Sequence, residues 1–273
     1  MGTKFPACQN PAPGYAFSRG RHNPQFLNMK NKIAFIIVGM FAAGVVWAAD
    51  APPASQVSDA IAKLKAATNY SWTVTTVTPA DAPFTPPPIK GQKEGGGFAR
   101  FSTQFGDNTA EAILKGDKVV FKGEEGWQLA AAGGGFSPDT FALHLARNGT
   151  AGDEAGIILK GVKELKALDG GAMGGDLSAA TATDLLTFGP RHSDAKADPE
   201  MPGPKGAKGS AKFWVKDGAL VKYQTHLTGT VSFNGNDTVL DFTRTTEIQE
   251  VGTTKMDIPA EAKKKLEAPP PAK

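Results

Sequence analysis

The stretch from Phe213 to Val251, FWVKDGALVKYQTHLTGTVSFNGNDTVLDFTRTTEIQEV, decides the fold. From Val221 to Phe233 the odd-numbered residues are mainly apolar and the even-numbered residues are polar. Because side chains alternate across a β-strand, this pattern predicts one face on a core and one face in water. Asp217-Gly218 and Asn234-Gly235 provide residues that tight hairpin turns require. The stretch therefore predicts three consecutive antiparallel strands, near 212–216, 219–233 and 238–251.

The N-terminal part of the chain has the pattern of a secretory signal peptide. Lys30 and Lys32 precede an apolar run that ends in small residues at Ala48 and Ala49. The apolar segment 33–49 has 17 residues, whereas a membrane-spanning helix needs about 20. We therefore expect 29–48 to be a signal peptide cleaved after Ala48, and the mature protein to reach the periplasm without spanning the membrane.

Residues 1–28 lie upstream of this signal. Met29 followed by Lys-Asn-Lys is typical of a natural start, so we interpret 1–28 as an upstream extension or a mis-assigned start. The only cysteine, Cys8, lies in this segment. The mature chain is therefore expected to contain neither a disulfide nor a cysteine for lipid attachment.

The net charge of +3 comes from the N-terminal segment. Five of the 30 basic residues and none of the 27 acidic residues precede Asp50, so the mature chain has a formal charge of −2. This balance gives no electrostatic support for nucleic-acid binding. The 225 residues from Ala49 onward are enough for one β-rich domain, which we expect over 49–262, followed by a disordered tail over 263–273.

The first half of the mature chain predicts a helix and a meander. Val57, Ile61 and Leu64 share one helical face over 55–67, with Ser55 as the candidate N-cap. The proline-rich segment 79–88 is expected to be a loop, because proline cannot donate to a sheet. Strands are expected at 70–77, 98–105, 109–114, 119–122 and 127–129.

The middle of the chain changes to a helical period. Ser137-Pro138-Asp139 predicts a helix that stops at Asn148-Gly149. Further helices are expected over 153–168, where Gly170-Gly171 would end the helix, and over 176–186. A mobile loop is expected over 189–209. The order of elements predicts an α+β fold: a single curved antiparallel β-sheet, a half-open barrel, with helices covering its concave face.

The segment Ala112–Trp127, the closing segment Val251–Pro259 and the order of elements together resemble the periplasmic lipoprotein-carrier superfamily. This superfamily includes LolA-type carriers, LppX-type lipid-binding lipoproteins and the lipid-sensing domain of RseB-type regulators. The resemblance covers roughly residues 55–260. It implies a half-open barrel whose concave apolar face binds a lipid or the acyl chain of a lipoprotein. The chain departs from the carriers in its loops at 79–88 and 189–209, and from the lipid-binding lipoproteins in lacking the anchor cysteine.

Large side chains of the predicted strands are the candidates for lining such a cavity. They could equally fill an ordinary core. The candidate ligand-binding residues are Trp72, Phe101, Trp127, Trp214, Phe233, Phe242 and Arg244.

Arg244 differs from the other candidates because it is charged. Its neighbours at even positions of the last strand, including Phe242 and Ile248, are largely apolar. A buried guanidinium needs a partner, which could be a covering loop or the polar head of a ligand. The alternative is a bulge or twist that lets Arg244 reach solvent, and we favour this alternative because bulges and snorkelling are common.

No pattern in the sequence predicts an enzyme, a metal site or a cofactor. Arg191-His192-Ser193-Asp194 contains the residue types of a hydrolytic triad, but neighbours in one loop cannot converge as a triad. His144 and His226 have no further ligand at metal-binding spacing. Two functions remain: a carrier that binds a lipid or an acylated protein, or an envelope interaction module with a filled core. The sequence does not predict the oligomeric state.

Overall fold

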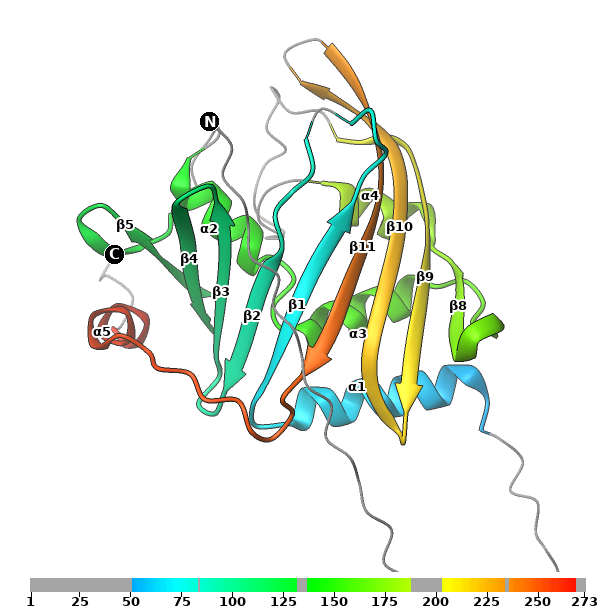
Figure 1. Ribbon diagram of the computed structural model, residues 1–273, viewed down its shortest axis with the longest axis horizontal. Helices are drawn as coiled ribbons and strands as arrows, with labels where there is room; N and C mark the ends of the chain where they lie inside the picture. Colours follow the sequence, from blue (N-terminus) through cyan, green and yellow to red (C-terminus); the bar gives the residue numbers. More distant parts are fainter. Residues whose placement is uncertain (1–50, 83, 132–136, 188–202, 234–235, 269–273) are drawn as a thin grey trace, which may run out of the picture. The chain divides into compact units, whose positions relative to one another are not determined.

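In the computed structural model, residues 51–82, 84–131, 137–187, 203–233 and 236–268 are described. They form an open antiparallel sheet of 11 strands in the order β6-β5-β4-β3-β2-β1-β11-β10-β9-β8-β7 (Figure 1). The expected α+β fold with a single curved antiparallel sheet is confirmed. Residues 243–249 of the last long strand pair with residues 71–77 of the first strand, so both meanders join in one sheet.

The strands vary from two to 15 residues, and the long ones lie at the centre of the sheet. Their bounds are β1 Tyr70–Val77, β2 Ile89–Glu94, β3 Phe98–Phe105, β4 Asn108–Lys115, β5 Lys118–Gly123, β6 Gly126–Leu129, β7 Lys166–Ala167, β8 Ala172–Asp176, β9 Lys205–Lys216, β10 Ala219–Phe233 and β11 Asn236–Gln249. The helices are α1 Pro53–Ala66, α2 Pro138–Ala146, α3 Ala151–Gly161, α4 Ala179–Leu186 and α5 Ala260–Glu267.

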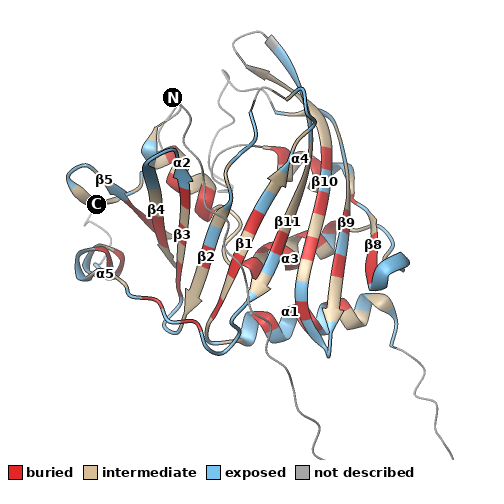
Figure 2. Ribbon diagram, in the orientation of Figure 1, coloured by how far each residue is buried: buried red, intermediate tan, exposed pale blue. Residues whose placement is uncertain are grey.

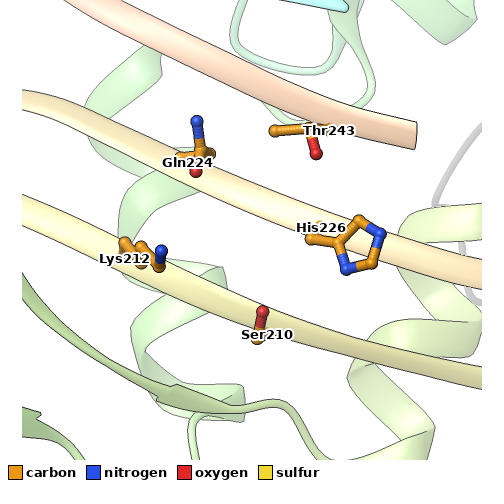
Figure 3. A pocket seen from close by; sticks show the side chains of 5 residues that line it. All are labelled: Ser210, Lys212, Gln224, His226 and Thr243. Carbon is orange, nitrogen blue, oxygen red and sulfur yellow. The ribbon is translucent and has the colours of Figure 1, made fainter. Parts of the chain in front are cut away.

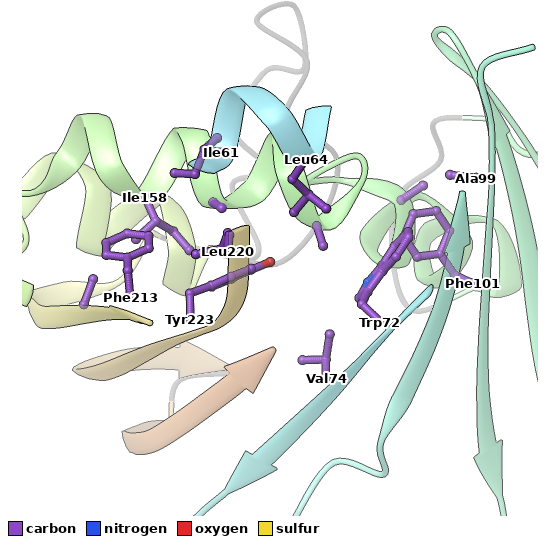
Figure 4. Packing of buried hydrophobic residues seen from close by; sticks show 14 of the residues in the cluster. Ile61, Leu64, Trp72, Val74, Ala99, Phe101, Ile158, Phe213, Leu220 and Tyr223 are labelled. Carbon is purple, nitrogen blue, oxygen red and sulfur yellow. The ribbon is translucent and has the colours of Figure 1, made fainter. Parts of the chain in front are cut away.

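The main hydrophobic core lies between the sheet and helices α1 to α4. Figure 4 shows Ile61 and Leu64 of α1 and Ile158 of α3 pointing toward Phe213 and Tyr223 on the sheet. Buried positions alternate with exposed ones along the central strands (Figure 2). The opposite face of the central strands is therefore largely polar and in water, as the alternating pattern predicted.

A second, smaller core lies on the other side of the sheet. Phe98, Ile113, Val120 and Trp127 pack there against Leu266 of α5 and its neighbours. Helix α2 therefore covers β4 and β5 on one side, and α5 covers β4 to β6 on the other. This part of the sheet is buried on both faces, unlike its centre.

The hairpin of β10 and β11 agrees with the prediction, but the pairing of β9 with β10 is irregular. Its register shifts between Thr228 and Thr230 and again, beside the turn, between Leu220 and Lys222. As a result Leu220 is buried, whereas Val221 is 36% exposed. The predicted alternation is therefore correct from Tyr223 onward and wrong at Val221.

Three strands were not predicted: β2, β8 and the two-residue β7, which lies within the segment 153–168 that was predicted as a helix. The segment of β2 contains Gly91 and three charged residues, a composition that disfavours strands, and β8 contains Gly174 and Gly175. At Gly91 a Cβ atom would overlap the indole of Trp72. The glycine is explained by this close approach from a neighbouring strand, which sequence periodicity does not report.

Three predicted element ends were wrong. Helix α3 stops at Gly161 instead of residue 168, since Val162 is extended and pairs with Leu177. Strand β9 begins at Lys205, within the segment 189–209 that was predicted as a loop, and residues 189–202 of this segment lie outside the described part of the chain. The N-cap of α1 is Pro52, not Ser55.

The predicted disordered tail was also placed too early. Helix α5 continues through Glu267, and Lys115 forms an ion pair with Glu267 at 2.7 Å. Residues 269–273, as well as the predicted segments 1–28 and 29–48, lie outside the described part of the chain.

Candidate functional site

An apolar cavity of about 470 Å³ lies at one rim of the helix-covered face. It is formed by side chains from the proline-rich segment, from β2 and β3, and from α2. The lining residues are Phe84, Pro86, Pro87, Ile89, Thr103, Phe105, Phe141, His144 and Leu145. We call this the rim cavity.

The local sequence explains why these side chains converge. Ile89 pairs with Thr103 across β2 and β3, so both side chains lie on the same face of the sheet. On α2, Phe141, His144 and Leu145 are separated by three or four residues and therefore lie on one helical face. Ser137 caps the N-terminus of this helix by accepting a hydrogen bond from the Thr140 backbone N–H.

The cavity is open to solvent beside two phenylalanines. Phe84 is 60% exposed and Phe105 is 41% exposed. The rings of Phe105 and Phe141 meet edge to face with centroids 5.6 Å apart. These aromatic side chains therefore frame the opening with apolar surface.

Only two of the lining residues are polar. The hydroxyl of Thr103 donates a hydrogen bond to the Pro88 carbonyl oxygen at 3.1 Å. Burial, together with the positive charges of Arg244 and Arg147, lowers the pKa of His144 to about 3. His144 is therefore neutral at physiological pH, and none of the side chains that line the cavity carries a charge there.

The centre of the helix-covered face, in contrast, is filled. Between α3, α4 and the strands β10 and β11 there is a gap of about 10 Å³, which is at the lower limit for one water molecule. Trp72 packs edge to face on Phe101 with centroids 5.8 Å apart, and both side chains are buried (Figure 4). Trp72 and Phe101 therefore belong to the main core, and neither lines the rim cavity.

The other predicted aromatic residues occupy different places. Phe242 borders the small gap in the centre, whereas Trp127 belongs to the second core under α5. Trp214 lies on the polar face, where the ammonium of Lys222 is 4.1 Å from its ring centroid. The expectation that Trp127 and Trp214 share the helix-covered face was wrong, because neighbouring residues of a strand point to opposite faces. The side chain of Phe233 lies outside the described part.

Arg244 lies on the helix-covered face and has a partner there. Its guanidinium is 3.4 Å from Oε1 of Glu154 on α3, and its side chain is 29% exposed. Strand β11 pairs with β1 and β10 without a register shift at this position. The favoured bulge is therefore absent at this position of the described strand, and the partner of Arg244 is a carboxylate on a covering helix.

A polar hollow of about 360 Å³ lies on the opposite, water-exposed face. Figure 3 shows the side chains that line it, which come from β9, β10 and β11: Ser210, Lys212, Gln224, His226 and Thr243. His226 Nε2 is 2.8 Å from Oδ1 of Asp241. This hollow has no apolar floor, and its residues are those of an ordinary wet sheet face.

The rim cavity was not predicted from the sequence. The segment 79–88 was expected to be a loop, and Phe141 and Leu145 were expected only to share one face of a helix. A usable signal was present, because Phe84 is an aromatic residue within a proline-rich loop and has no strand partner to pack on. In the described ranges, no group of three or more His, Cys, Asp or Glu residues could hold a metal ion. Every helix in these ranges is too short or too polar to cross a membrane.

The fold and the cavity together define a class of protein: an open curved sheet with one helix-covered face and an apolar cavity at its rim. Among solved structures, the Mycobacterium tuberculosis lipoprotein LppX is similar, with a TM-score of 0.43 and 14% identity, over 77% of this chain and 100% of that one. LprF from Mycobacterium bovis has a TM-score of 0.36 and 12% identity, over 75% of this chain and 94% of that one.

A LolA superfamily protein from Nitrosomonas europaea has a TM-score of 0.30 and 7% identity, over 77% of this chain and 96% of that one. LppX and the LolA superfamily are two of the groups that the sequence resembles. No family model and no curated protein matches the chain. The likeness concerns the general fold alone.

Proposed function

We propose that this protein binds a hydrophobic ligand, a lipid or the acyl chain of a lipoprotein, in the rim cavity. The observation that carries the proposal is an open cavity of about 470 Å³ with seven apolar residues among the nine that line it. Pockets for small molecules measure roughly 300–1,000 Å³. An acyl chain in this cavity would leave water for an apolar surface, which is favourable by roughly 25 cal/mol per Å² buried.

The arrangement of the opening supports an amphiphilic ligand with an alkyl chain. Phe84 and Phe105 are both lining residues and exposed residues, so apolar surface continues from the cavity to the solvent. A ligand that covered them would bury surface that is otherwise in contact with water. A small polar ligand would gain nothing from these contacts.

The proposed location is the periplasm, with a mature chain that begins at Ala49. The basic residues, the apolar run and the small residues that end at Ala48 support this part of the proposal. N-terminal sequencing of the protein from the envelope fraction tests it. A sequence that starts upstream of Ala49 would contradict cleavage at this site.

The test of ligand binding is native mass spectrometry of residues 49–273, followed by titration with a fluorescent fatty acid. We expect co-purifying lipid or saturable uptake. The variant Ile89→Trp places a larger side chain in the cavity and should weaken uptake at least tenfold. The matched control is Val251→Trp, at an exposed site beside the opposite end of β1, where the Gly252 N–H bonds the Asn69 carbonyl.

Equal binding by both variants would place the ligand elsewhere, and no uptake by the unmodified protein would overturn the proposal. In that case the second function gains support: an envelope interaction module with a filled core. A specific observation favours this alternative, because the gap in the centre of the helix-covered face measures only about 10 Å³.

A further inference from the structure

The end of the rim cavity that is formed by His144 lies near the ion pair of Arg244 and Glu154. This ion pair bears on the charge of the ligand that the cavity can bind. Arg244 on β11 pairs with Thr76 on β1. Two residues along β1, Val74 pairs with Ile89, which lines the cavity. Arg244 is therefore only one strand away from the cavity wall and lies on the same face of the sheet.

His144 connects the cavity with Arg244. Its ring lines the cavity, and the guanidinium of Arg244 is one of the charges that lower its pKa. A positive charge lowers the pKa of a histidine because it disfavours the imidazolium. Burial is the larger cause of the lowered pKa, and the two arginine charges show that guanidinium groups lie near the cavity wall at His144. A guanidinium is the group that best matches the oxygens of an anionic head.

The contacts of Glu154 show how firmly Arg244 is held. One carboxylate oxygen accepts a hydrogen bond from the Tyr223 hydroxyl at 2.6 Å, and the other accepts one from the Asn148 amide at 2.6 Å. Arg244 is farther from Glu154, at 3.4 Å. Glu154 therefore has two short hydrogen bonds that do not depend on Arg244.

The guanidinium of Arg244 retains hydrogen-bonding capacity. It makes no hydrogen bond to another residue in the described part of the chain, and 29% of the side chain is exposed. A guanidinium carries five N–H donors in a fork that matches carboxylate and phosphate oxygens. Arg244 borders the central gap of about 10 Å³, which has no room for a second anion, so an anion would meet the guanidinium on the exposed 29% of the side chain while the contact with Glu154 is kept.

We propose that the ligand is a single-chain amphiphile with an anionic head, a carboxylate or a phosphate. The alkyl chain occupies the rim cavity, and Arg244 binds the head beside His144. This inference rests on the proposed function, since it concerns the head of the ligand whose chain fills that cavity. It adds a charge requirement that the apolar lining alone does not impose.

The experiment compares three ligands with the same 16-carbon chain: hexadecanoate, hexadecyl phosphate and hexadecanol. Competition against a bound fluorescent probe gives each affinity at pH 8 and low salt. We expect at least one of the two anions to bind the unmodified protein at least tenfold more tightly than the alcohol. The anion that binds more tightly identifies the head as carboxylate or phosphate.

The variant Arg244→Gln should reduce the affinity for the preferred anion to that for the alcohol and leave the alcohol unchanged. The matched control is Arg100→Gln. Like Arg244, Arg100 has a side chain that is 29% exposed and forms an ion pair with an acid, Glu111. Unlike Arg244, it lies on the opposite face of the sheet. It should retain the preference for the anion.

The outcomes separate the two proposals. Equal binding of all three ligands would overturn the anionic head and leave the proposed function intact, whereas no binding of any would overturn the proposed function. If Arg244→Gln does not fold, two other measurements test the proposal. The unmodified protein should bind the anion more tightly than hexadecanol, and Arg244→Lys, which keeps the positive charge, should do the same. A preference that persists unchanged in a folded Arg244→Gln would overturn the role of Arg244.

Discussion

The hydroxyl of Tyr223 donates a hydrogen bond to Oε2 of Glu154 at 2.6 Å, and both side chains are buried between β10 and α3. Burial raises the pKa of Tyr223 well above its ordinary value, and the neighbouring carboxylate raises it further. The phenol therefore stays protonated and remains a donor. This contact ties the covering helix to the longest strand of the sheet.

Replacement of the Tyr223 phenol should destabilise the protein, because the buried carboxylate of Glu154 loses a hydrogen-bond donor. We expect Tyr223→Phe to lower the free energy of unfolding by about 1.5–3 kcal/mol, the range for hydrogen bonds to charged groups. Chemical denaturation measures it. The comparison is Tyr70→Phe, which removes a buried hydrogen bond from the neutral Gly152 N–H and should cost about 0.5–1.5 kcal/mol. Equal costs would show that the charge of Glu154 is unimportant.

The interior of α3 contains a glycine that packing does not require. A Cβ atom at Gly156 would lie 3.8 Å from a methyl group of Ile61, which is an ordinary contact. We therefore expect Gly156→Ala to raise the free energy of unfolding by about 0.5–1 kcal/mol, since alanine favours the helix. Thermal unfolding monitored by circular dichroism measures the change.

Gly161, at the end of the same helix, is the matched control. A Cβ atom there would overlap the side chain of Thr181 on α4. Gly161→Ala should therefore destabilise the protein, by about 1–3 kcal/mol as for other overpacked sites. Stabilisation by both variants would mean that helix propensity alone decides and that α3 and α4 are not in close contact.

The parts of the fold that could be predicted are those whose signal is local. The strand β10 shows a period of two over 13 residues, and Ser137-Pro138 marks the start of α2. By contrast, β2 could not be predicted, because Gly91 gives it the composition of a turn. The glycine is needed there to make room for Trp72 of the neighbouring strand. Such a requirement comes from another segment of the chain and leaves no periodic pattern.

The candidate site was harder to predict for the same reason. Aromatic residues can be identified by type, but the face that each one occupies depends on strand register. Trp214 and Phe213 are adjacent in sequence, yet Phe213 is in the main core and Trp214 is on the wet face. The rim cavity combines a loop, two strands and a helix, and no single segment contains its pattern. Arg244 could be singled out because its charge interrupts an apolar alternation within one strand.

The position of α5 predicts how the second core responds to mutation. Leu266 is 4% exposed and packs with Trp127 and Val120. We expect Leu266→Ala to cost about 2 kcal/mol, at the lower end of the range for buried leucines, because the helix is at the periphery. Denaturant unfolding monitored by tryptophan fluorescence measures it.

An exposed residue of the same helix provides the control. Lys264→Ala should change the free energy of unfolding by no more than about 0.5 kcal/mol, as is usual for surface positions. If Leu266→Ala is equally neutral, α5 does not pack on the sheet in solution, and the disordered tail predicted from the sequence is correct after all.

His144 should make the protein sensitive to acid in a defined range. Its pKa is about 3 in the folded protein, whereas the ordinary value is 6.5. Between these two values the unfolded chain binds a proton that the folded protein does not bind, so stability rises with pH there. Above pH 6.5 His144 is neutral in both states and contributes no pH dependence. The stabilisation is therefore lost as the pH falls from 6.5 toward 3, by at most about 1.4 kcal/mol per pH unit.

The variant His144→Leu lacks this titrating group, so its stability should fall less steeply than that of the unmodified protein over the same range. Denaturant unfolding of the ligand-free proteins at pH 4, 5, 6, 7 and 8 measures the difference. From pH 7 to pH 8 the two proteins should differ by a constant amount, which provides an internal control. Parallel curves below pH 6.5 would mean that the imidazole is protonated in the folded protein. His144 would then bring a positive charge to the rim cavity, and its wall would no longer be uncharged.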